Sequence, residues 1–255
     1  MSQYILETQK LSKVFGGLTA ISNLDLKIET GKITAIIGPN GAGKTTLFNI
    51  VAGVFLPTEG KVIFDGKLLN GISATERVRM GISRTFQQVH LFREMTVLEN
   101  IMCGRYLRTR TGFAESGLRL PRGLREEEEI QLDSDRFLNM VEQGRQGNLK
   151  ASQIPLGQQK LVSIGRALAT EPRLLLLDEP GAGLNAIEKM GLSDLIKRIR
   201  DMGITVVLVE HDMDLVMGTA DWVAVLVYGQ KIAEGTPGQV QRDRRVISAY
   251  LGEDK

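Results

Sequence analysis

The chain contains very little of several residue types on which whole classes of function depend. Its 255 residues include one cysteine, Cys103, and two histidines. A single cysteine forms no internal disulfide and no thiolate metal cluster, which indicates a reducing compartment. The 32 basic and 30 acidic residues give a formal net charge of +2, so neither sign dominates. We therefore expect no nucleic-acid partner and no direct attraction to an anionic membrane.

Long hydrophobic runs are also missing. The runs at residues 33–37, 174–177 and 223–227 are far shorter than the roughly 18 residues that indicate a transmembrane helix. The first residues, MSQYILETQK, contain no basic stretch followed by an apolar core, so no secretory signal is expected. Any association with a membrane is therefore expected to depend on a protein partner. With 42% hydrophobic residues, a chain of this length buries a large core.

The apolar patterns that are present predict an α/β fold. Alternating Leu24, Leu26 and Ile28 and the short runs at residues 33–37 and 62–64 indicate strands. Strand-like and helix-like segments alternate again over residues 174–227, which is typical of βα units on a largely parallel sheet. We predict an α/β core with a parallel sheet and with antiparallel strands at its edge.

The middle of the chain has a helical character instead. Ile130, Phe137, Leu138 and Val141 fall on one face of a helix. We predict a single domain over 1–255, divided as follows: the core at 1–89 and 161–255, a helical subdomain at 90–160, and an exposed insertion at 109–129.

A glycine-rich segment follows the apolar run at residues 33–37. It reads Gly38-Pro39-Asn40-Gly41-Ala42-Gly43-Lys44-Thr45 and fits the pattern G-x-x-x-x-G-K-S/T. Glycines let backbone N–H groups turn toward phosphate oxygens, and the N-terminus of the next helix favours negative charge. Lys44 can neutralise the β- and γ-phosphates, and the Thr45 hydroxyl can bind Mg²⁺. In this context the segment predicts a nucleotide site rather than a chance glycine-rich turn.

Two carboxylates follow the leucines at residues 174–177. Asp178 and Glu179 would lie at the carboxyl end of a buried strand, where open α/β sheets bind ligands. We assign Asp178 to Mg²⁺, through water, and Glu179 to the polarisation of an attacking water molecule. Acidic pairs after strands are often structural, so this interpretation depends on the glycine-rich segment.

A second apolar strand, at residues 205–209, leads to His211 at the same predicted edge of the sheet. A hydrogen-bond donor there could contact a γ-phosphate, although an isolated histidine is more often a cap or a surface residue. Gln87 and Gln88 follow Arg84-Thr85-Phe86, where strand-like sequence gives way to helical sequence. This position makes the two glutamines candidates that their residue type alone would not suggest.

Together these motifs resemble the ATP-binding subunits of ABC transporters over nearly the whole chain. The matching segments occur in the family's order, at residues 13–17, 38–46, 87, 154–158, 174–179, 183–185 and 211. The resemblance implies a P-loop NTPase fold of the ABC type with an inserted helical lobe. It implies an ATP hydrolase with ATP and Mg²⁺ as cofactors. It also implies that two such subunits enclose two nucleotides between them.

The resemblance assigns roles residue by residue. Phe15 matches the aromatic residue that stacks on adenine, and Gln87 matches the glutamine that touches Mg²⁺ and relays to the membrane partner. The nucleotide-binding residues are then Phe15, Gly38, Pro39, Asn40, Gly41, Ala42, Gly43, Lys44, Thr45, Thr46 and Asp178. The metal would be held by Thr45, Gln87 and Asp178. The catalytic residues would be Lys44, Gln87, Glu179 and the switch histidine His211. The signature loop, which acts on the opposite subunit's nucleotide, corresponds to Ile154, Pro155, Leu156, Gly157 and Gln158.

Further segments narrow the resemblance. The larger ATP-binding subunit of branched-chain amino-acid importers is similar to this chain in four segments. These are residues 84–87 and 91–96 and, in the tail, residues 235–237 and 246–252. This similarity implies transmembrane permease subunits, a second and non-identical ATPase subunit, and an extracytoplasmic solute-binding protein as partners. The chain would then act at the cytoplasmic face of the inner membrane. Related ATPases for urea, amides or lipopolysaccharide export share parts of the pattern.

Two residues depart from the general family pattern. Pro155 replaces the signature serine, whose hydroxyl reaches the γ-phosphate held by the opposite subunit, and Asn185 replaces the D-loop aspartate. A proline is tolerated where a helix begins because its missing N–H has no intrahelical acceptor there. We therefore expect a weakened nucleotide site on the partner and an intact one on this chain.

Two other classes of function are less consistent with the sequence. Soluble ABC ATPases that gate ribosomes or clamp DNA usually carry two such units or a long coiled coil, and this chain has neither. A P-loop kinase of small molecules would leave the signature loop and His211 unexplained.

Overall fold

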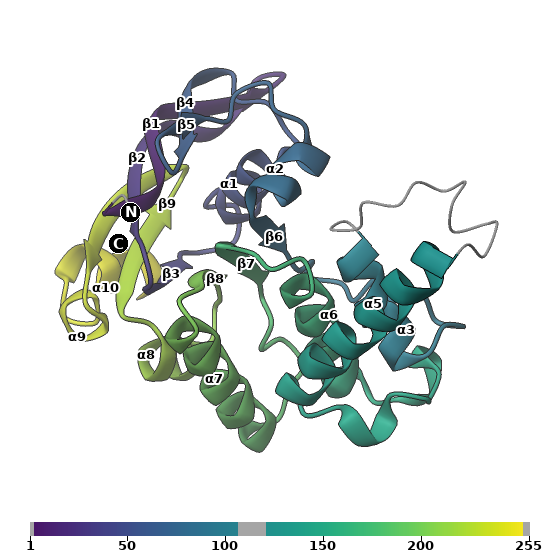
Figure 1. Cartoon of the computed structure of the whole chain (residues 1–255). Coiled ribbons are helices and arrows are strands. Elements are labelled where there is room, and N and C mark those ends of the chain that lie inside the picture. Colours follow the sequence, from purple (N-terminus) through teal and green to yellow (C-terminus); the bar gives the residue numbers. More distant parts are fainter. Residues whose placement is uncertain (1–2, 107–120, 252–255) are drawn as a thin grey trace. The chain divides into compact units, whose positions relative to one another are not determined.

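The computed structural model describes residues 3–106 and 121–251. Its contacts form two compact units, which are the described parts of 1–84 with 173–255 (unit 1) and of 85–172 (unit 2) (Figure 1). The predicted insertion at 109–129 lies outside the described residues as far as residue 120. From Pro121 onward the chain is already helical, so the helix begins inside the predicted insertion.

A six-stranded sheet forms the centre of unit 1. Its order is β10-β9-β3-β8-β7-β6, and all neighbours pair in parallel except β10 with β9. The strands are β3 (Ile33–Ile37), β6 (Ile82–Arg84), β7 (Leu174–Asp178), β8 (Thr205–Val209), β9 (Trp222–Val227) and β10 (Gln230–Gly235). Every residue of β3, β7 and β8 is buried, which explains why these strands are mostly apolar, with only Thr34, Asp178 and Thr205 as polar residues. The predicted parallel sheet is confirmed.

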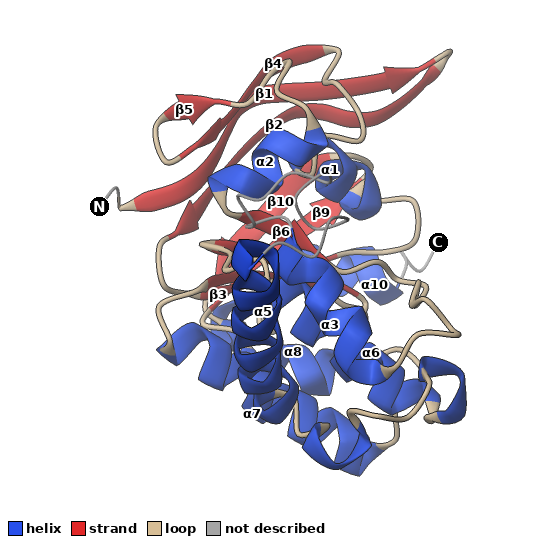
Figure 2. Ribbon diagram, turned by 45° about the vertical axis from the view of Figure 1, so that its right-hand side comes forward, coloured by secondary structure: helices blue, strands red, loops and turns tan. Residues whose placement is uncertain are grey.

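A second, antiparallel sheet belongs to the same unit and is drawn in red in Figure 2. Its order is β2-β1-β4-β5, with β1 (Tyr4–Phe15), β2 (Leu18–Glu29), β4 (Glu59–Phe64) and β5 (Lys67–Leu68). In β2, Leu24, Leu26 and Ile28 are buried and alternate with exposed residues, because successive side chains of a strand point to opposite faces. The predicted antiparallel β part is confirmed.

The helices of unit 1 cover both faces of the parallel sheet. They are α1 (Lys44–Val51), α2 (Ala74–Met80), α7 (Ala186–Asp201), α8 (Met213–Thr219), α9 (Pro237–Val240) and α10 (Arg244–Leu251). Helix α1 buries Leu47, Phe48 and Ile50 in one core cluster with residues of the antiparallel sheet and of β3, β7 and β8. On the other face, Val216, Val240 and Val246 join Ile37 and Val225 in a second cluster. The core of unit 1 therefore holds α1 between two sheets.

Unit 2 consists of packed helices in the described residues. These are α3 (Val97–Arg105), α5 (Pro121–Met140) and α6 (Leu156–Leu168), with short 3₁₀ turns η2 (Gly144–Gln146) and η3 (Ala151–Gln153). The side chains of Ile130, Phe137, Leu138 and Val141 are buried, as a common helix face requires. A Cβ at Gly104 would overlap the carbonyl oxygen of Arg166, so glycine lets α3 approach α6 closely.

Candidate nucleotide site

Three parallel strands of unit 1 bring the predicted motifs to one edge of the sheet. Strand β3 lies beside β8, and β8 lies beside β7. Because the strands are parallel, their carboxyl ends meet. The glycine-rich loop after β3, the acidic pair at the end of β7 and His211 after β8 therefore converge.

The backbone of the glycine-rich loop is fixed by its neighbours. A Cβ at Gly38 would overlap the carbonyl oxygen of Leu226, and one at Gly43 would lie 2.5 Å from that of Ala20. Both glycines have positive φ, 151° and 98°. The carbonyl of Ala42 accepts a hydrogen bond from the N–H of Gly229 (3.1 Å). The loop is thus anchored by β2 and by the β9–β10 turn, which only these glycines permit.

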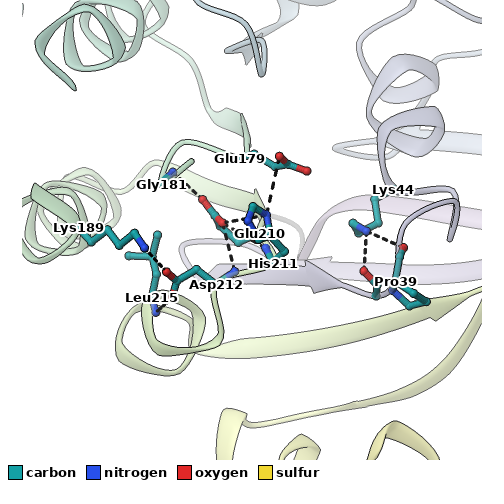
Figure 3. Close-up of polar contacts among 10 residues, drawn as sticks. Pro39, Lys44, Glu179, Gly181, Lys189, Glu210, His211, Asp212 and Leu215 are labelled. Atoms are coloured by element: carbon teal, nitrogen blue, oxygen red, sulfur yellow. Dashed lines mark hydrogen bonds and ion pairs between the residues drawn. The ribbon is translucent and has the colours of Figure 1, made fainter. Parts of the chain in front are cut away.

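Lys44 is the first residue of α1 and its side chain turns back over the loop (Figure 3). Its Nζ donates to the carbonyl oxygens of Gly38 (2.6 Å) and Pro39 (3.0 Å). Burial lowers the pKa of the ammonium group, and the nearby carboxylates of Glu179 and Asp178 act in the opposite direction. This ammonium group already lies within the electrostatic field of both acids.

The rest of the loop differs in exposure. Asn40, Gly41 and Thr45 are exposed, whereas Ala42 is buried. Gly43 caps α1 in the left-handed conformation, and no side chain caps this helix end. The first backbone N–H groups of α1 are therefore not capped by protein side chains, which is the arrangement that suits a phosphate ligand.

Asp178 is the last residue of β7 and its side chain is 2% exposed. Its Oδ2 accepts a hydrogen bond from the guanidinium of Arg84 (2.7 Å), while Oδ1 is buried with no hydrogen-bond partner among the described residues. Nothing in the sequence pattern singled out Arg84 for this contact, because the two residues are 94 positions apart. The carboxylate is held firmly on one side only.

Glu179 and His211 approach each other across the edge of the sheet (Figure 3). The His211 Nδ1 lies 3.8 Å from Glu179 Oε2, and the histidine side chain is 62% exposed. Glu179 has a positive φ of 46°, which is uncommon for a residue with a side chain and typical of functional sites. The exposed imidazole of His211 and the partly exposed carboxylate of Glu179 can both reach a ligand at this edge.

Glu210 is a buried residue of the site whose role the sequence does not indicate. Its side chain is 0% exposed. One carboxylate oxygen accepts from the N–H of Gly181 (2.6 Å) and the other from the N–H of His211 (3.2 Å) and Asp212 (3.5 Å). Glu210 therefore ties the chain after Glu179 to the chain around His211 (Figure 3). Its position next to His211 is the only sequence signal that could have pointed to it.

Comparison with known proteins shows to which family the chain belongs. Residues 21–182 match the family model described as ABC transporter, and residues 230–255 match that described as branched-chain amino acid ATP-binding cassette transporter. The chain is 41% identical over 254 residues to the high-affinity branched-chain amino acid transport ATP-binding protein BraF of Pseudomonas aeruginosa. The alignment covers 99% of this chain and 100% of BraF. The chain belongs to the ABC transporter family. It is an ABC transporter ATPase of the branched-chain amino acid type.

Other relatives of this ABC ATPase support the same family assignment. The branched-chain amino acid transport ATP-binding protein LivG of Escherichia coli K12 is also 41% identical, over 99% of this chain and 100% of that one. A crystal structure of an ABC transporter ATP-binding cassette in its ADP conformation superposes with a TM-score of 0.86 at 34% identity, covering 99% of this chain and 100% of the other. The predicted family, fold and ATPase activity are confirmed, and ADP is seen to bind a cassette of this fold.

Phe15, the predicted adenine-stacking residue, lies at the end of β1 and is 40% exposed. Its ring meets Phe55 edge to face (5.3 Å between centroids), and the Lys13 ammonium lies 4.8 Å from its centroid. One aromatic face is thus supported by protein while the ring stays accessible. The stacking role itself stays a prediction.

Thr46, the last predicted residue of the glycine-rich segment, is partly buried on α1, whereas Gln87 and the signature loop belong to unit 2. Gln87 is exposed in the loop after β6. The signature loop leads into α6, where Pro155 occupies the N-cap position and makes no side-chain capping bond. Ile154 is buried, Leu156 is exposed, and Oε1 of Gln158 is buried with no hydrogen-bond partner among the described residues. All five signature residues lie in unit 2.

Asn185, the second departure from the general ABC pattern, has a local role. It is the N-cap of α7, and its Oδ1 accepts from the N–H of Glu188 (3.0 Å) while the Glu188 carboxylate accepts from the N–H of Asn185 (2.9 Å). Asparagine caps a helix as well as aspartate does. The missing charge therefore costs the fold little.

Among the described residues, no helix combines the length and apolar character that a bilayer span requires. Within the same residues, no three His, Cys, Asp or Glu side chains are grouped closely enough to hold a metal ion.

Proposed function

We propose that this ABC ATPase hydrolyses Mg-ATP at the sheet edge of unit 1 and thereby powers a membrane importer of branched-chain amino acids. The observation that carries the proposal is the convergence of Lys44, Asp178, Glu179 and His211 on one edge of a parallel sheet. The full-length similarity to transport ATP-binding proteins supports it.

The residues at this edge fit Mg²⁺. Asp178 offers a buried carboxylate oxygen, Oδ1, with no hydrogen-bond partner among the described residues. The Thr45 hydroxyl, at the exposed start of α1, is a second hard oxygen donor. Mg²⁺ commonly binds to one or two such protein ligands, with water and substrate phosphates completing its shell. When bound, the ion would neutralise phosphate charge. Gln87, the third ligand that the family resemblance implies, belongs to unit 2, and its role stays a prediction.

The protein's own groups would then position the reaction. Lys44 would exchange its two carbonyl partners for phosphate oxygens, and the N–H groups of the loop would bind the same phosphates. Glu179 would accept a hydrogen bond from the attacking water, and His211 would donate to the γ-phosphate. Phosphoryl transfer requires mainly such positioning and charge neutralisation.

The proposed setting is the cytoplasmic face of the inner membrane. The partners are transmembrane permease subunits, a second and non-identical ATPase subunit, and an extracytoplasmic solute-binding protein of the same system, with no nucleic acid. A relative supports pairing between cassettes: an ATP-binding cassette with ADP and Pi bound is dimeric and superposes with a TM-score of 0.78 at 29% identity, covering 91% of this chain and 98% of the other.

Hydrolysis is tested by a pair of glutamate variants. Loss of a positioned general base typically costs about 10²- to 10⁴-fold in rate, so Glu179→Gln should lower ATP turnover by that factor and leave ATP binding intact. Glu142→Gln is the matched control, since Glu142 also has a positive φ (60°) and lies in unit 2, outside the acidic edge. Equal turnover in Glu179→Gln and wild type would overturn the assignment.

The substrate is tested in proteoliposomes that contain the permease subunits and both ATPase subunits. Leucine, isoleucine or valine, presented with the binding protein, should stimulate ATP turnover and enter the vesicles. Urea and short amides are the comparison substrates, because their transporters share parts of the sequence pattern. Stimulation by urea or an amide instead would replace the proposed substrate class without changing the assignment of an ATPase.

A further inference from the structure

Arg84 is a buried charged residue at the sheet edge that the proposed reaction does not yet use. It is the last residue of β6, and its side chain is 7% exposed. One guanidinium nitrogen donates to Asp178 Oδ2 (2.7 Å) and another to the side-chain oxygen of Asn49 on α1 (2.6 Å). The guanidinium also lies 5.7 Å from the centroid of the Phe48 ring. Three elements of unit 1 thus meet at this one side chain.

The contact with Arg84 makes the two carboxylate oxygens of Asp178 different from each other. Oδ2 is occupied by a charge-assisted hydrogen bond, and Oδ1 is buried without a partner in the described structure. Because the guanidinium is planar and rigid, the two contacts of Arg84 fix its plane and hence the direction of the Asp178 carboxylate. A lysine at this position would donate from a single nitrogen and would not fix that plane.

We infer that Arg84 is a positioning residue for Mg²⁺: it holds Asp178 with Oδ1 directed to the metal's water shell, and it links this carboxylate to α1, the helix that begins with Lys44 and Thr45. The inference rests on the proposed Mg²⁺ site. The contact with Asn49 favours it over a simple stabilising ion pair, because the same guanidinium connects the two segments that supply the proposed metal ligands.

The test measures nucleotide binding rather than turnover. A fluorescent ATP analogue is titrated into wild type, Arg84→Gln and Arg84→Lys, in EDTA and over a series of Mg²⁺ concentrations. Loss of a residue that orients a metal ligand commonly costs about 10- to 100-fold in metal affinity, so the half-saturating Mg²⁺ concentration should rise by that factor in Arg84→Gln. Arg84→Lys should lie between. Binding in EDTA should be the same in all three proteins.

Arg173→Gln is a matched control in the same unit. Arg173 also pairs with an aspartate, Asp65 (2.8 Å), and its guanidinium also lies 5.7 Å from a phenylalanine ring, that of Phe64. Its removal deletes an arginine with partners of the same type that does not pair with Asp178, although the Arg173 side chain is more exposed (40% against 7%). The Mg²⁺ dependence of this variant should equal that of wild type.

Three outcomes separate the possibilities. A Mg²⁺ dependence in Arg84→Gln equal to that of wild type overturns the inference. An equal loss of affinity in EDTA and in Mg²⁺ also overturns it, because that result indicates a structural role for Arg84. If wild type itself shows no Mg²⁺ dependence, the proposed metal site fails, independently of Arg84. Should Arg84→Gln unfold, Arg84→Lys and Asn49→Ala apply the same comparison, with a smaller rise expected.

Discussion

At the scale of single residues, Glu210 and Asp212 lie on either side of His211 in opposite electrostatic surroundings. Burial raises the pKa of the Glu210 carboxyl, and the backbone N–H groups that donate to it offset only part of this effect. The hydrogen bond from Lys189 lowers the pKa of the Asp212 carboxyl. Neighbouring carboxyls therefore contribute to stability with opposite dependence on pH.

The sign for Glu210 follows from proton binding. Its folded pKa lies above the unfolded value of 4.5, so the folded protein binds the proton more tightly. The contribution of Glu210 to stability is complete below pH 4.5 and declines as pH rises through the folded pKa. In Glu210→Gln this decline should be missing, so the stability of wild type relative to the variant should fall with rising pH. Chemical denaturation between pH 4.5 and 8 measures the difference.

Asp212→Asn is the companion measurement. The pKa of Asp212 is lowered from 3.8, so the carboxyl is ionised in both folded and unfolded chains above about pH 5. The stability difference between wild type and Asp212→Asn should therefore stay constant over pH 5 to 8. A constant difference for Glu210→Gln as well would show that Glu210 carries no raised pKa.

Residue identities at the site could be predicted only where a local motif marks them. Residues 38–45 and the acidic pair at 178–179 stand out because glycine, lysine and carboxylates occur at a fixed distance from an apolar run. Arg84 does not stand out, because its partners Asn49 and Asp178 are 35 and 94 positions away. Contacts of this kind arise from the order of the strands in the sheet, which no short segment encodes.

At the scale of elements, helix α1 depends on tertiary contacts. It has only eight residues, fewer than an isolated helix needs to be stable in water. Its C-terminal carbonyls, those of Ile50 and Val51, accept hydrogen bonds from the guanidinium of Arg77 on α2 (2.5 and 3.0 Å). Arg77 is fully buried and also donates to the carbonyls of Leu69 and Ile72. A cation at this end also interacts favourably with the helix dipole.

Removing Arg77 should therefore destabilise unit 1 strongly. Arg77→Met would leave four carbonyl groups without this donor, and unsatisfied buried polar groups cost about 1 to 3 kcal/mol each. Some of these carbonyls also accept backbone bonds or could gain water, so we expect a loss of about 3 to 5 kcal/mol in unfolding free energy. Arg79→Met is the control, because Arg79 is exposed on the same helix. Urea denaturation compares them, and losses of similar size in both variants would contradict this role.

Elements were predictable where their pattern is regular. The buried strands β3, β7 and β8 are short and mostly apolar, and the alternation of such segments with helical ones indicated a parallel sheet. Strand β1 shows no simple alternation, because register shifts and a positive φ at Lys10 interrupt its pairing with β2. Helix α2 is short, and its capping box of Ser73 and Glu76 was the signal that could have revealed it.

At the scale of the whole molecule, the ABC motifs are divided between two units. Lys44, Asp178, Glu179 and His211 belong to unit 1, whereas Gln87 and the signature loop belong to unit 2. If cassettes pair as the family resemblance implies, the signature loop of one subunit completes the nucleotide site of the other. Pro155 then removes a hydroxyl from the partner's site and not from its own.

This division predicts how the chain pairs. In Glu179→Gln, which should hold ATP without hydrolysing it, we expect the chain alone to stay monomeric in Mg-ATP and to dimerise with its partner ATPase. Adding Pro155→Ser should restore a hydroxyl at both sites of a homodimer. Hydrogen bonds to charged groups contribute about 1.5 to 3 kcal/mol each, so self-association should tighten by about 100-fold or more.

Pro155→Ala in the same background separates the hydroxyl from the loss of the ring. The alanine variant also frees the backbone at the start of α6 but supplies no donor, so it should stay monomeric. Size-exclusion chromatography with light scattering, with and without Mg-ATP, distinguishes the three proteins. A dimer of Glu179→Gln alone would mean that Pro155 permits self-pairing, and the inequality of the two nucleotide sites would then need another cause. Dimers of the serine and alanine variants alike would assign the effect to the proline ring.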